Sequence, residues 1–326
     1  MSFRTIQGGA APRSGVTKLP HDRSDLLWSG GEPTPLFLDS INRWVDAMVA
    51  DEHGGGVGPA GLVEARITAK ASGLLCGCPV AERLLERHFP ECSIKWGAVE
   101  GGAVERGDAV ATLRGAADDV LRLERILLNL LGRLSGIATN SARWTEAGRT
   151  IRVAATRKTE WGLLDKWAVH IGGGLTHRLD RSDALMLKEN DLSAMSEDGE
   201  DGPRVIQRVV SSLNMDEHAG FTVVEVLDVE QSLAAAIAWD SVQSARGGDE
   251  RLVLLLDNMG AAGAGGVHRA LTEAGLRQRC ILEGSGGVFL ESFGEWSQSG
   301  VDLVSSSALN RGVVPLDMSM LIGGGE

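Results

Sequence analysis

Hydrophobic residues recur at helical spacing in two stretches of the N-terminal half. In residues 35–52 the apolar side chains are three or four positions apart, which predicts a helix. A longer apolar stripe runs through residues 120–134, directly after Asp118 and Asp119, which we expect to cap this second helix. Its polar face either lies in solvent or offers guanidinium groups to an anion. That face carries Arg122, Arg125, Asn129 and Arg133.

Alternating apolar and polar positions predict short strands between these two helices. Residues 63–70 are typical of a half-buried strand, and further strands are expected at residues 94–96 and 110–113. Residues 78–88 fit a helix. Strands with helices on one side indicate a small α+β sandwich domain.

From residue 150 the pattern changes, and six short apolar segments alternate with helical stretches. The segments cover residues 151–155, 184–187, 221–226, 252–256, 280–282 and 303–304. This rhythm predicts βα units around a parallel sheet, either open or closed into a barrel. The fold class is therefore α/β, with an N-terminal α+β domain followed by this parallel sheet.

Polar clusters follow these six segments. They contain Thr156-Arg157-Lys158, Lys188-Glu189-Asn190, Glu225, Asp257-Asn258, Glu283-Gly284-Ser285-Gly286-Gly287 and Ser305-Ser306-Ser307. Loops are commonly polar, and that alone would explain the Ser and Gly residues in these clusters. It does not readily explain the cations and carboxylates that come directly after buried strands. Because α/β barrels place reactive groups at the carboxyl ends of their strands, we expect one site there.

The expected site contains three sets of groups. The cations suit a dianionic aromatic acid, because Arg binds carboxylates bidentately and Lys supplies a compact charge. They are Arg157, Lys158, His177, Arg178 and Lys188. The carboxylates of Glu225 and Asp257 can bind sugar hydroxyls or Mg²⁺, directly or through water. The serine and glycine turns can hold a phosphate. Their candidate residues are Ser285, Gly286, Gly287, Ser305 and Ser307.

Composition narrows the classes of protein. The net charge of −12 argues against a nucleic-acid partner, although residues 120–190 carry twelve Lys or Arg against seven Asp or Glu, which favours a small anion. No apolar run approaches the roughly 20 residues of a membrane helix, so no membrane partner is expected. Four cysteines are too few for a disulfide framework, so we expect a cytoplasmic protein. Cys76 and Cys78 lack a second ligand pair, which favours buried thiols over a metal site.

Several ordered stretches identify a known family. They are ERILLNLLGRLSGIAT from residue 124, ATRKT from 155, LLDKWAVHIGGGLTHR from 163, ALMLKEN from 184, VVEV from 223, LLLDNM from 254, EGSGGV from 283 and GVDLVSSSAL from 300. With them, the chain resembles the quinolinate phosphoribosyltransferases, also called carboxylating nicotinate-nucleotide pyrophosphorylases. The chain departs from the usual pattern at Glu160-Trp161, Asp191, Val223, Ser307 and Arg311.

The resemblance implies a fold and an activity. An N-terminal sandwich domain would precede an incomplete α/β barrel, and active sites would be shared across a homodimer or a higher homo-oligomer. We expect a flexible tail over 1–34, the sandwich domain with a long linking helix over 35–139, the barrel over 140–312, and a segment over 313–326 that returns to the first domain. The substrates would be quinolinate and phosphoribosyl pyrophosphate, with Mg²⁺ as cofactor and release of CO2 in NAD biosynthesis.

The resemblance also implies roles for particular residues. Arg125 would reach the active site of a partner subunit. The five cations named above would form the pocket for quinolinate and the phosphates, and Ser285 to Gly287 would form the 5′-phosphate loop. Glu225 and Asp257 would act near the ribose hydroxyls and the metal. Lys158 would lie closest to the loss of CO2.

Three other functions fit the same residues. A related transferase could act on a different aromatic base, as in the family branch found with molybdenum-transport genes. A non-catalytic barrel could bind a nucleotide or anion, although that would not demand both carboxylates and all five cations. A barrel aldolase could form a Schiff base on Lys158 or Lys188.

Overall fold

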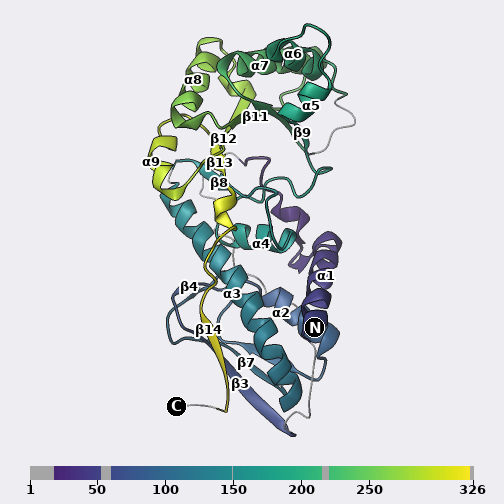
Figure 1. Cartoon of the computed structure of the whole chain (residues 1–326), viewed down its shortest axis with the longest axis vertical. Coiled ribbons are helices and arrows are strands. Elements are labelled where there is room, and N and C mark those ends of the chain that lie inside the picture. The colour runs from purple at the N-terminus through teal and green to yellow at the C-terminus, as the bar shows by residue number, and fades with distance from the viewer. Residues whose placement is uncertain (1–17, 53–59, 149, 215–219, 324–326) are drawn as a thin grey trace.

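The computed structural model describes residues 18–52, 60–148, 150–214 and 220–323. Figure 1 shows two bodies stacked along the long axis of the molecule, with helix α3 (Ala117–Ala147) running between them. The lower body is the N-terminal domain and the upper body contains the parallel sheet. The predicted fold class, an α+β domain followed by an incomplete α/β barrel, is confirmed.

The N-terminal domain is built on a four-stranded antiparallel sheet in the order β14-β3-β7-β5. The strands are β3 (Leu62–Ala69), β5 (Ser93–Trp96), β7 (Ala109–Ala116) and β14 (Met318–Ile322). Two small antiparallel pairs, β1 (Trp28–Ser29) with β2 (Glu32–Pro33) and β4 (Gly73–Leu74) with β6 (Ala103–Val104), lie outside this sheet. Helices α1 (Pro35–Asp51) and α2 (Cys78–His88) pack against each other, and α2 also packs against α3.

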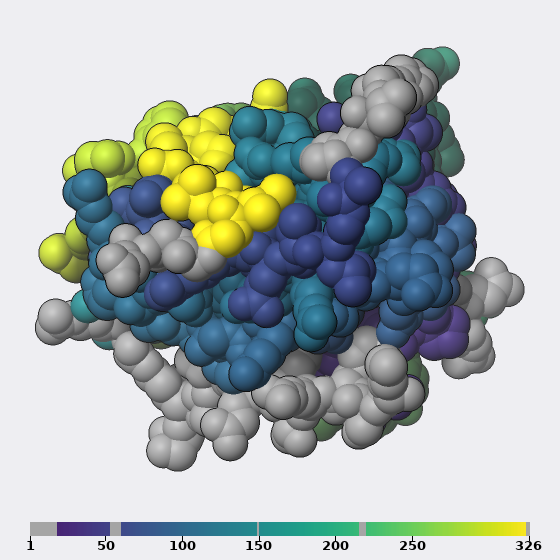
Figure 2. Space-filling model, turned by 90° about the horizontal axis from the view of Figure 1, so that it is seen from below, coloured from purple at the N-terminus to yellow at the C-terminus, as the bar shows by residue number. Residues whose placement is uncertain are grey.

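The C-terminal segment returns to this domain. Strand β14 runs antiparallel to β3, with Met320 opposite Ile67. Figure 2 shows the yellow C-terminal residues lying against the dark blue residues of the N-terminal domain. The chain therefore leaves the N-terminal domain through α3 and comes back to it at its end.

Helix α3 is longer than the hydrophobic pattern predicted. It continues for thirteen residues beyond the expected end at Leu134, to Ala147. A Cβ atom on Gly136 would lie 2.5 Å from the carbonyl oxygen of Val314, so glycine lets the returning chain pack closely on the helix. The predicted cap is wrong, because Ala116 is the N-cap residue while Asp118 and Asp119 lie in the first turn, where carboxylates favour the helix dipole.

The upper body is a six-stranded parallel sheet in the order β8-β13-β12-β11-β10-β9. Its strands are β8 (Arg152–Ala154), β9 (Leu185–Leu187), β10 (Thr222–Val226), β11 (Leu252–Asp257), β12 (Cys280–Ser285) and β13 (Leu303–Ser305). β8 and β9 are the two edges of the sheet, so the barrel is incomplete between them. A single parallel bridge from Ala154 to Leu175 extends the β8 edge.

Helices follow most of these strands. They are α4 (Leu163–Ile171), α5 (Glu189–Ala194), α6 (Gly202–Ser211), α7 (Val229–Arg246), α8 (Gly260–Glu273) and α9 (Phe293–Trp296). Short 3-10 helices cover η1 (Ser24–Leu26), η2 (Arg277–Arg279), η3 (Leu290–Ser292) and η4 (Ser307–Leu309). Among the residues described, no helix has the length and apolar character needed to cross a membrane.

The barrel encloses its own apolar cluster, separate from the larger core. Its members are Leu19, Ala154, Leu175, Ala184, Phe221, Val223, Val253, Leu255, Ile281 and Leu303. Side chains of a strand alternate between its two faces, so every second residue of β10, β11, β12 and β13 shares this inner face. Glu225, Asp257, Glu283, Ser285 and Ser305 therefore point inward, at or near the carboxyl ends of their strands.

The expected loose tail over residues 1–34 is corrected for its described part, residues 18–34. Leu19 belongs to the barrel cluster, and His21 and Leu27 are fully buried. Their burial depends on tertiary contacts that a short polar stretch of sequence does not reveal. Residues 1–17 lie outside the described residues.

Candidate active site

The carboxyl ends of the central strands bring four of the predicted residues to one rim. Asp257 ends β11 and lies in register with Ser285, which ends β12. Glu225 on β10 is in register with Leu255, one inward position before Asp257. Ser305 ends β13, in register with the last residue of β8. Residues from four separate segments of the sequence thus meet where the strands end.

Lys188 and Glu225 form an ion pair at this rim. The Nζ atom of Lys188 lies 2.7 Å from Oε2 of Glu225, and the backbone N–H of Glu189 donates to Oε1 at 3.2 Å. Glu225 is buried, whereas the Lys188 side chain is half exposed. Asp191, which departs from the family pattern, accepts a hydrogen bond from the Lys188 backbone N–H at 3.0 Å and so holds the start of α5.

The turn after β11 contacts the turn after β12. Asn258 has φ +54°, a left-handed conformation that Asn tolerates better than most residues. Its backbone N–H donates to the carbonyl of Ser285 at 3.0 Å, and its side-chain amide donates to Asp257 at 2.7 Å. Gly286 has φ +80°, and a Cβ there would lie 2.2 Å from Oδ1 of Asn258. Only glycine fits this close approach, which leaves the backbone of the turn accessible to a phosphate.

The loop after β8 carries Arg157 and Lys158, and both side chains are exposed. The side-chain amide of Asn310 donates to the carbonyl of Lys158 at 3.0 Å. Arg133 holds the rest of the loop, through ion pairs of 2.9 Å with Asp165 and 2.7 Å with Glu160. Arg133 is therefore engaged within the protein, and the view of its helix face as a row of anion-binding guanidinium groups is wrong at this position.

Arg178 and Lys166 lie close to Arg157. Burial lowers the pKa of Arg178, and the charges of Arg157 and Arg181 lower it further. Burial also lowers the pKa of Lys166 to about 7, and Arg157 and Arg178 contribute to that shift, although the attraction of Asp183 opposes it. Lys166 donates to the carbonyl of Thr176 at 2.6 Å. These mutual effects place three basic side chains in one region, together with the carboxylate of Asp183, and such a cluster can bind an anion.

His177 has both ring nitrogens engaged inside the barrel. Its Nδ1 accepts from the backbone N–H of Arg178 at 2.7 Å, so Nε2 carries the proton and donates to Glu283 at 3.1 Å. Burial lowers the pKa of His177 more than Glu283 raises it, which favours the neutral ring. At φ +55° the residue occupies a left-handed conformation that costs a non-glycine residue about 1–2 kcal/mol. His177 therefore positions its neighbours, and its ring has no free N–H for a carboxylate.

Glu283 is fully buried and binds a second histidine. His21 Nε2 lies 3.0 Å from Oε2 of Glu283. Burial alone would raise the pKa of Glu283, but its attraction to His177 and the hydrogen bonds from His177 and His21 outweigh burial and hold that pKa below its usual range. An ionised carboxylate thus lies beneath the rim, with each oxygen accepting one histidine N–H.

The serines after β13 differ in their contacts. Ser306 is buried, its Oγ donates to the carbonyl of Val288 at 2.9 Å, and its backbone N–H donates to Ala154 at 3.1 Å. Ser305 is buried at the end of its strand and Ser307 is half-buried at the start of η4. Ser306 therefore fixes the path of the turn, and Ser305 and Ser307 remain the candidates for phosphate contact.

Arg125 does not join the rim of its own chain. It is exposed in the first half of α3, whereas Asn140, further along the same helix, donates to the carbonyl of Ala308 beside the end of β13. At 1.5 Å per residue, Arg125 lies about 22 Å from Asn140 along the helix axis. The remaining predicted residues gather at or just below the strand ends.

The sequence did not single out several residues that hold this site. Lys166 and Thr176 lie within a quoted family stretch but were given no role, Asp183 and His21 belong to no quoted motif, and Glu283 was noted only as the start of a glycine turn. A glutamate in the middle of an otherwise apolar strand was the available signal, because a buried carboxylate requires partners.

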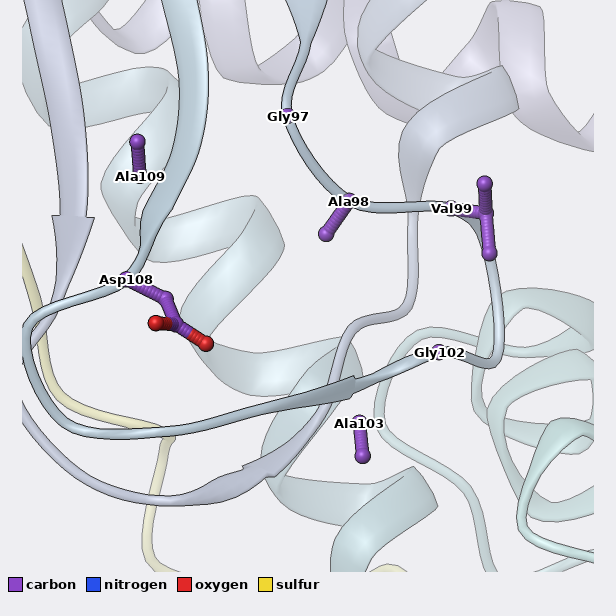
Figure 3. A pocket seen from close by; sticks show the side chains of 7 residues that line it. All are labelled: Gly97, Ala98, Val99, Gly102, Ala103, Asp108 and Ala109. Atoms are coloured by element: carbon purple, nitrogen blue, oxygen red, sulfur yellow. The ribbon is translucent and has the colours of Figure 1, made fainter.

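Among the described residues, two hollows lie outside the cation cluster, and the first of them shares Glu225 with the rim. One of about 420 Å³ at the ends of β9 and β10 is lined by Glu189, Leu192, Glu200, Val205 and Glu225, among others. The other, of about 510 Å³, lies in the N-terminal domain, where Figure 3 shows Asp108 facing a rim of small residues. Neither is lined by the cations that an anionic substrate needs.

The oxygen donors at the rim suit Mg²⁺. Asp257 and Glu225 offer carboxylates, the ligands that Mg²⁺ prefers. Both oxygens of Glu225 already accept hydrogen bonds, so contact through water fits better there than direct ligation. Within the described residues, His21, His177 and Glu283 are the one group of three whose ligand atoms lie close enough together to hold a metal. Cys76 and Cys78 are buried free thiols, and burial raises the pKa of both.

Comparison with known proteins places the chain. Two family models match it: "Quinolinate phosphoribosyl transferase, N-terminal domain" over residues 57–135 and "Quinolinate phosphoribosyl transferase, C-terminal domain" over residues 137–321. A probable nicotinate-nucleotide pyrophosphorylase [carboxylating] of Methanothermobacter thermautotrophicus is 34% identical over 268 residues, which cover 80% of this chain and 89% of that protein. A protein of the same name from Archaeoglobus fulgidus is 33% identical over 270 residues, or 81% and 96% of the two chains.

A solved structure gives the same result. The crystal structure of NadC from Streptococcus pyogenes superimposes with a TM-score of 0.72 at 27% identity, over 89% of this chain and 97% of that one. Both domains are therefore matched, in sequence and in fold. The chain belongs to the quinolinate phosphoribosyl transferase family.

Proposed function

We propose that the protein transfers a phosphoribosyl group from phosphoribosyl pyrophosphate to quinolinate, with loss of CO2, to form nicotinate mononucleotide and pyrophosphate in NAD biosynthesis. The relatives carry names for this activity. The observation that carries the proposal is the convergence of cations, two carboxylates and a glycine turn at the strand ends of one barrel. A dianionic aromatic acid and a sugar phosphate together need these three kinds of group.

The cations would bind quinolinate. Arg157 and Arg178 are near enough for one charge to lower the pKa of the other, so a bound dianion relieves a repulsion that exists without it. Guanidinium groups match the geometry of a carboxylate bidentately. Lys188 would reach the substrate by exchanging its contact with Glu225 for one with a carboxylate. Lys158, exposed in the loop after β8, completes the set.

The carboxylates and the turns would hold the sugar phosphate. Glu225 and Asp257 would accept hydrogen bonds from the ribose hydroxyls and hold Mg²⁺, with Glu225 acting through water. When bound, Mg²⁺ would neutralise charge on the pyrophosphate. The backbone of Ser285 to Gly287, with Ser305 and Ser307, would bind the 5′-phosphate.

The protein would act mainly by position and electrostatics. The C–O bond to pyrophosphate breaks as positive charge builds on the anomeric carbon, and the pyridine nitrogen forms its bond to that carbon. The bond to the ortho carboxylate then breaks and CO2 leaves, while the electron pair of that bond stays on the neighbouring ring carbon, where the positive nitrogen stabilises it. A proton takes the vacated position. Lys158 is the cation we assign to this step.

We also propose that the active sites are shared within a homodimer or a higher homo-oligomer. Arg125 is exposed and lies about 22 Å along α3 from Asn140, the helix residue that contacts the turn after β13, so a partner's site is the one it can serve. The four cysteines are free, which supports a reducing compartment such as the cytoplasm.

One assay tests the proposal. Purified protein is incubated with quinolinate, phosphoribosyl pyrophosphate and Mg²⁺, and nicotinate mononucleotide is followed by mass. We expect product and CO2 in equal amounts. Turnover of another aromatic base without CO2, or tight binding of phosphoribosyl pyrophosphate without turnover, would contradict it.

A further inference from the structure

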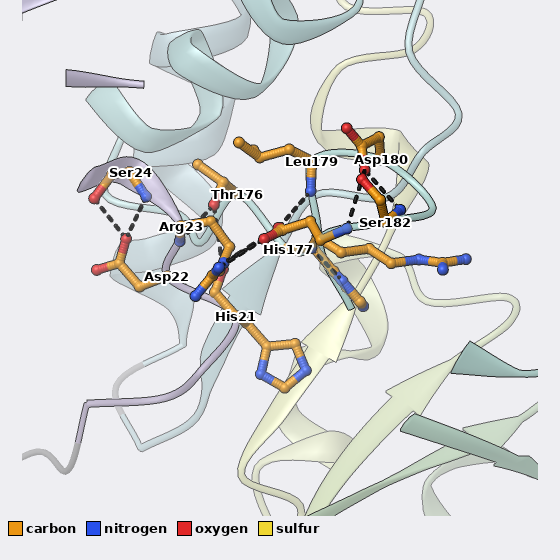
Figure 4. Close-up of polar contacts among 11 residues, drawn as sticks. His21, Asp22, Arg23, Ser24, Thr176, His177, Leu179, Asp180 and Ser182 are labelled. Carbon is orange, nitrogen blue, oxygen red and sulfur yellow. Dashed lines mark hydrogen bonds and ion pairs between the residues drawn. The ribbon is translucent and has the colours of Figure 1, made fainter. Parts of the chain in front are cut away.

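Residues 18–24 run along the segment that carries His177 and Arg178, as Figure 4 shows. We call residues 18–24 the N-terminal strap. We propose that His21 and Arg23 of this strap are positioning residues, which fix the cation-bearing segment in the shape that binds the anionic substrate. The choice of quinolinate as that substrate rests on the proposed function, but the positioning itself does not.

The strap contacts the two residues that directly precede Arg178. The carbonyl oxygen of His21 accepts from the His177 backbone N–H at 2.8 Å and from the Thr176 hydroxyl at 3.2 Å. The backbone N–H of Arg23 donates to the same Thr176 hydroxyl at 2.8 Å. These contacts fix Thr176 and His177 directly before Arg178.

Arg23 adds a charged anchor. Its guanidinium lies 2.6 Å and 2.9 Å from Oδ1 of Asp183, through Nη2 and Nε. The other oxygen of Asp183 accepts from the Leu179 backbone N–H at 2.9 Å. Arg23 thus holds the far end of the segment, beyond Arg178, through a carboxylate that is itself bonded to the segment.

His21 adds a buried anchor on the opposite side. Its ring and that of His177 meet edge to face, with centroids 4.9 Å apart, and each donates to one oxygen of Glu283. Within the described residues, Nδ1 of His21 has no hydrogen-bond partner. Nε2 is the ring nitrogen of His21 that contacts Glu283. His21 therefore fixes the carboxylate that in turn fixes His177.

These contacts explain how an unfavourable conformation persists. His177 has φ +55°, and such a conformation lasts only where the surroundings determine it at several points. The strap supplies the carbonyl oxygen that accepts from the His177 backbone N–H. It also supplies a ring that binds the same carboxylate as the His177 ring, and the guanidinium that binds Asp183. Leu19 secures the strap by packing inside the barrel.

The strap lies outside the part of the chain that defines the family. The matched N-terminal domain begins at residue 57. This chain therefore places residues from its own N-terminus against the segment that joins β8 to β9, the two edge strands of the incomplete barrel.

Full-length variants test the proposal. His21→Ala removes the buried anchor, and His21→Gln keeps a donor at the same reach. Arg23→Ala removes the charged anchor, and Arg23→Lys keeps the charge. Asp25→Asn is the matched control, because its ion pair with Lys18 is exposed. The first measurement is hydrogen exchange of peptides that contain residues 174–180. The second compares the change in the KM for quinolinate with the change in kcat.

We expect exchange in residues 174–180 to be at least about tenfold faster in His21→Ala and Arg23→Ala, and close to wild type in His21→Gln, Arg23→Lys and Asp25→Asn. The KM for quinolinate should rise about tenfold or more in the two alanine variants, with a smaller change in kcat. Unchanged exchange in both alanine variants would overturn the proposal. The proposal would also be overturned if the wild-type protein bound one metal ion per chain and His21→Gln removed that ion. If the wild-type protein does not use quinolinate, the proposed function is wrong. The hydrogen exchange of residues 174–180 then tests by itself whether His21 and Arg23 are positioning residues.

Discussion

Lys188 donates from Nζ to Oε2 of Glu225 at 2.7 Å, although the two residues are assigned to different substrates. The Lys188 side chain is 49% exposed, so solvent screens the pair and its contribution to stability is small. The pair therefore keeps a cation and a carboxylate ready at the rim, where quinolinate and the ribose would each take one partner.

A double-mutant cycle separates these effects. We expect Lys188→Ala to raise the KM for quinolinate at least about tenfold, because a charge-assisted contact is lost. We expect the free energy of unfolding to fall by less than about 1 kcal/mol. Glu225→Ala should act mainly on the KM for phosphoribosyl pyrophosphate. Steady-state kinetics and urea unfolding of the two single variants and the double variant measure both effects.

A second ion pair supplies the control. Arg246 and Glu250 form an ion pair on the surface of the same domain, with both side chains exposed. Arg246→Ala should leave both KM values unchanged. A loss of more than about 2 kcal/mol of stability in Lys188→Ala, with unchanged kinetics, would show that the pair is structural.

Asp257 should control the response to Mg²⁺. Removal of Mg²⁺ with a chelator should abolish turnover. Asp257→Asn should raise the Mg²⁺ concentration for half-maximal rate about tenfold or more, because one negative ligand is lost. The measurement is the initial rate across a Mg²⁺ titration, with the exposed residue Asp249 changed to Asn as control. Undiminished turnover in the presence of chelator would contradict this assignment.

Arg157→Ala should abolish turnover. Arg157 lies beside Arg178 in the cation cluster, and loss of a bidentate guanidinium should lower kcat/KM at least about a hundredfold. Arg106→Ala removes an exposed arginine of the N-terminal domain and serves as the control. Near-normal kcat/KM in Arg157→Ala would remove this residue from the site.

The glycine turn allows a matched pair of substitutions. Gly286 and Gly275 have similar positive φ values, +80° and +71°, so alanine strains both backbones alike. Only at Gly286 does a Cβ meet another group, 2.2 Å from Oδ1 of Asn258, whereas nothing lies within 4 Å at Gly275. Gly286→Ala should therefore raise the KM for phosphoribosyl pyrophosphate, while Gly275→Ala should only lower stability by about 1 kcal/mol. Equal KM values in the two variants would show that the turn does not bind phosphate.

The spacing of hydrophobic residues was sufficient to predict the six strands of the parallel sheet. Apolar segments such as residues 252–256 and 280–282 correspond to β11 and β12, because strands buried on both faces are continuously apolar. The extension of α3 to Ala147 was missed, since Gly136 and its polar neighbours are helical through packing against the returning chain. The local pattern of apolar and polar residues does not reveal this contact with a distant part of the chain.

The rim of the site was predictable for a similar reason. Asp257 and Ser285 end buried strands, and parallel strands bring their carboxyl ends together. The support beneath the rim was not predictable, because His21 and Glu283 are 262 positions apart and carry no shared motif. Arg133 shows the reverse error, since its place on a polar helix face did not reveal its pairing with Asp165.

Lys166 should make the stability of the protein depend on pH in the alkaline range. Burial lowers its pKa from 10.5 to about 7, so between these values the unfolded chain keeps a proton that the folded chain has lost. The free energy of unfolding must then rise with pH from about 7 to about 10.5, and below about 7 the dependence vanishes because both states are protonated.

Lys166→Met isolates this effect. The difference in unfolding free energy, wild type minus variant, should increase from pH 7 to pH 10 with a slope that approaches about 1.4 kcal/mol per pH unit. Urea unfolding at pH 7, 8, 9 and 10 measures it. Lys70→Met, at an exposed position, should give a flat difference. A flat difference for Lys166→Met as well would mean that the buried amine keeps its ordinary pKa, and the cation cluster would then hold a full additional charge at neutral pH.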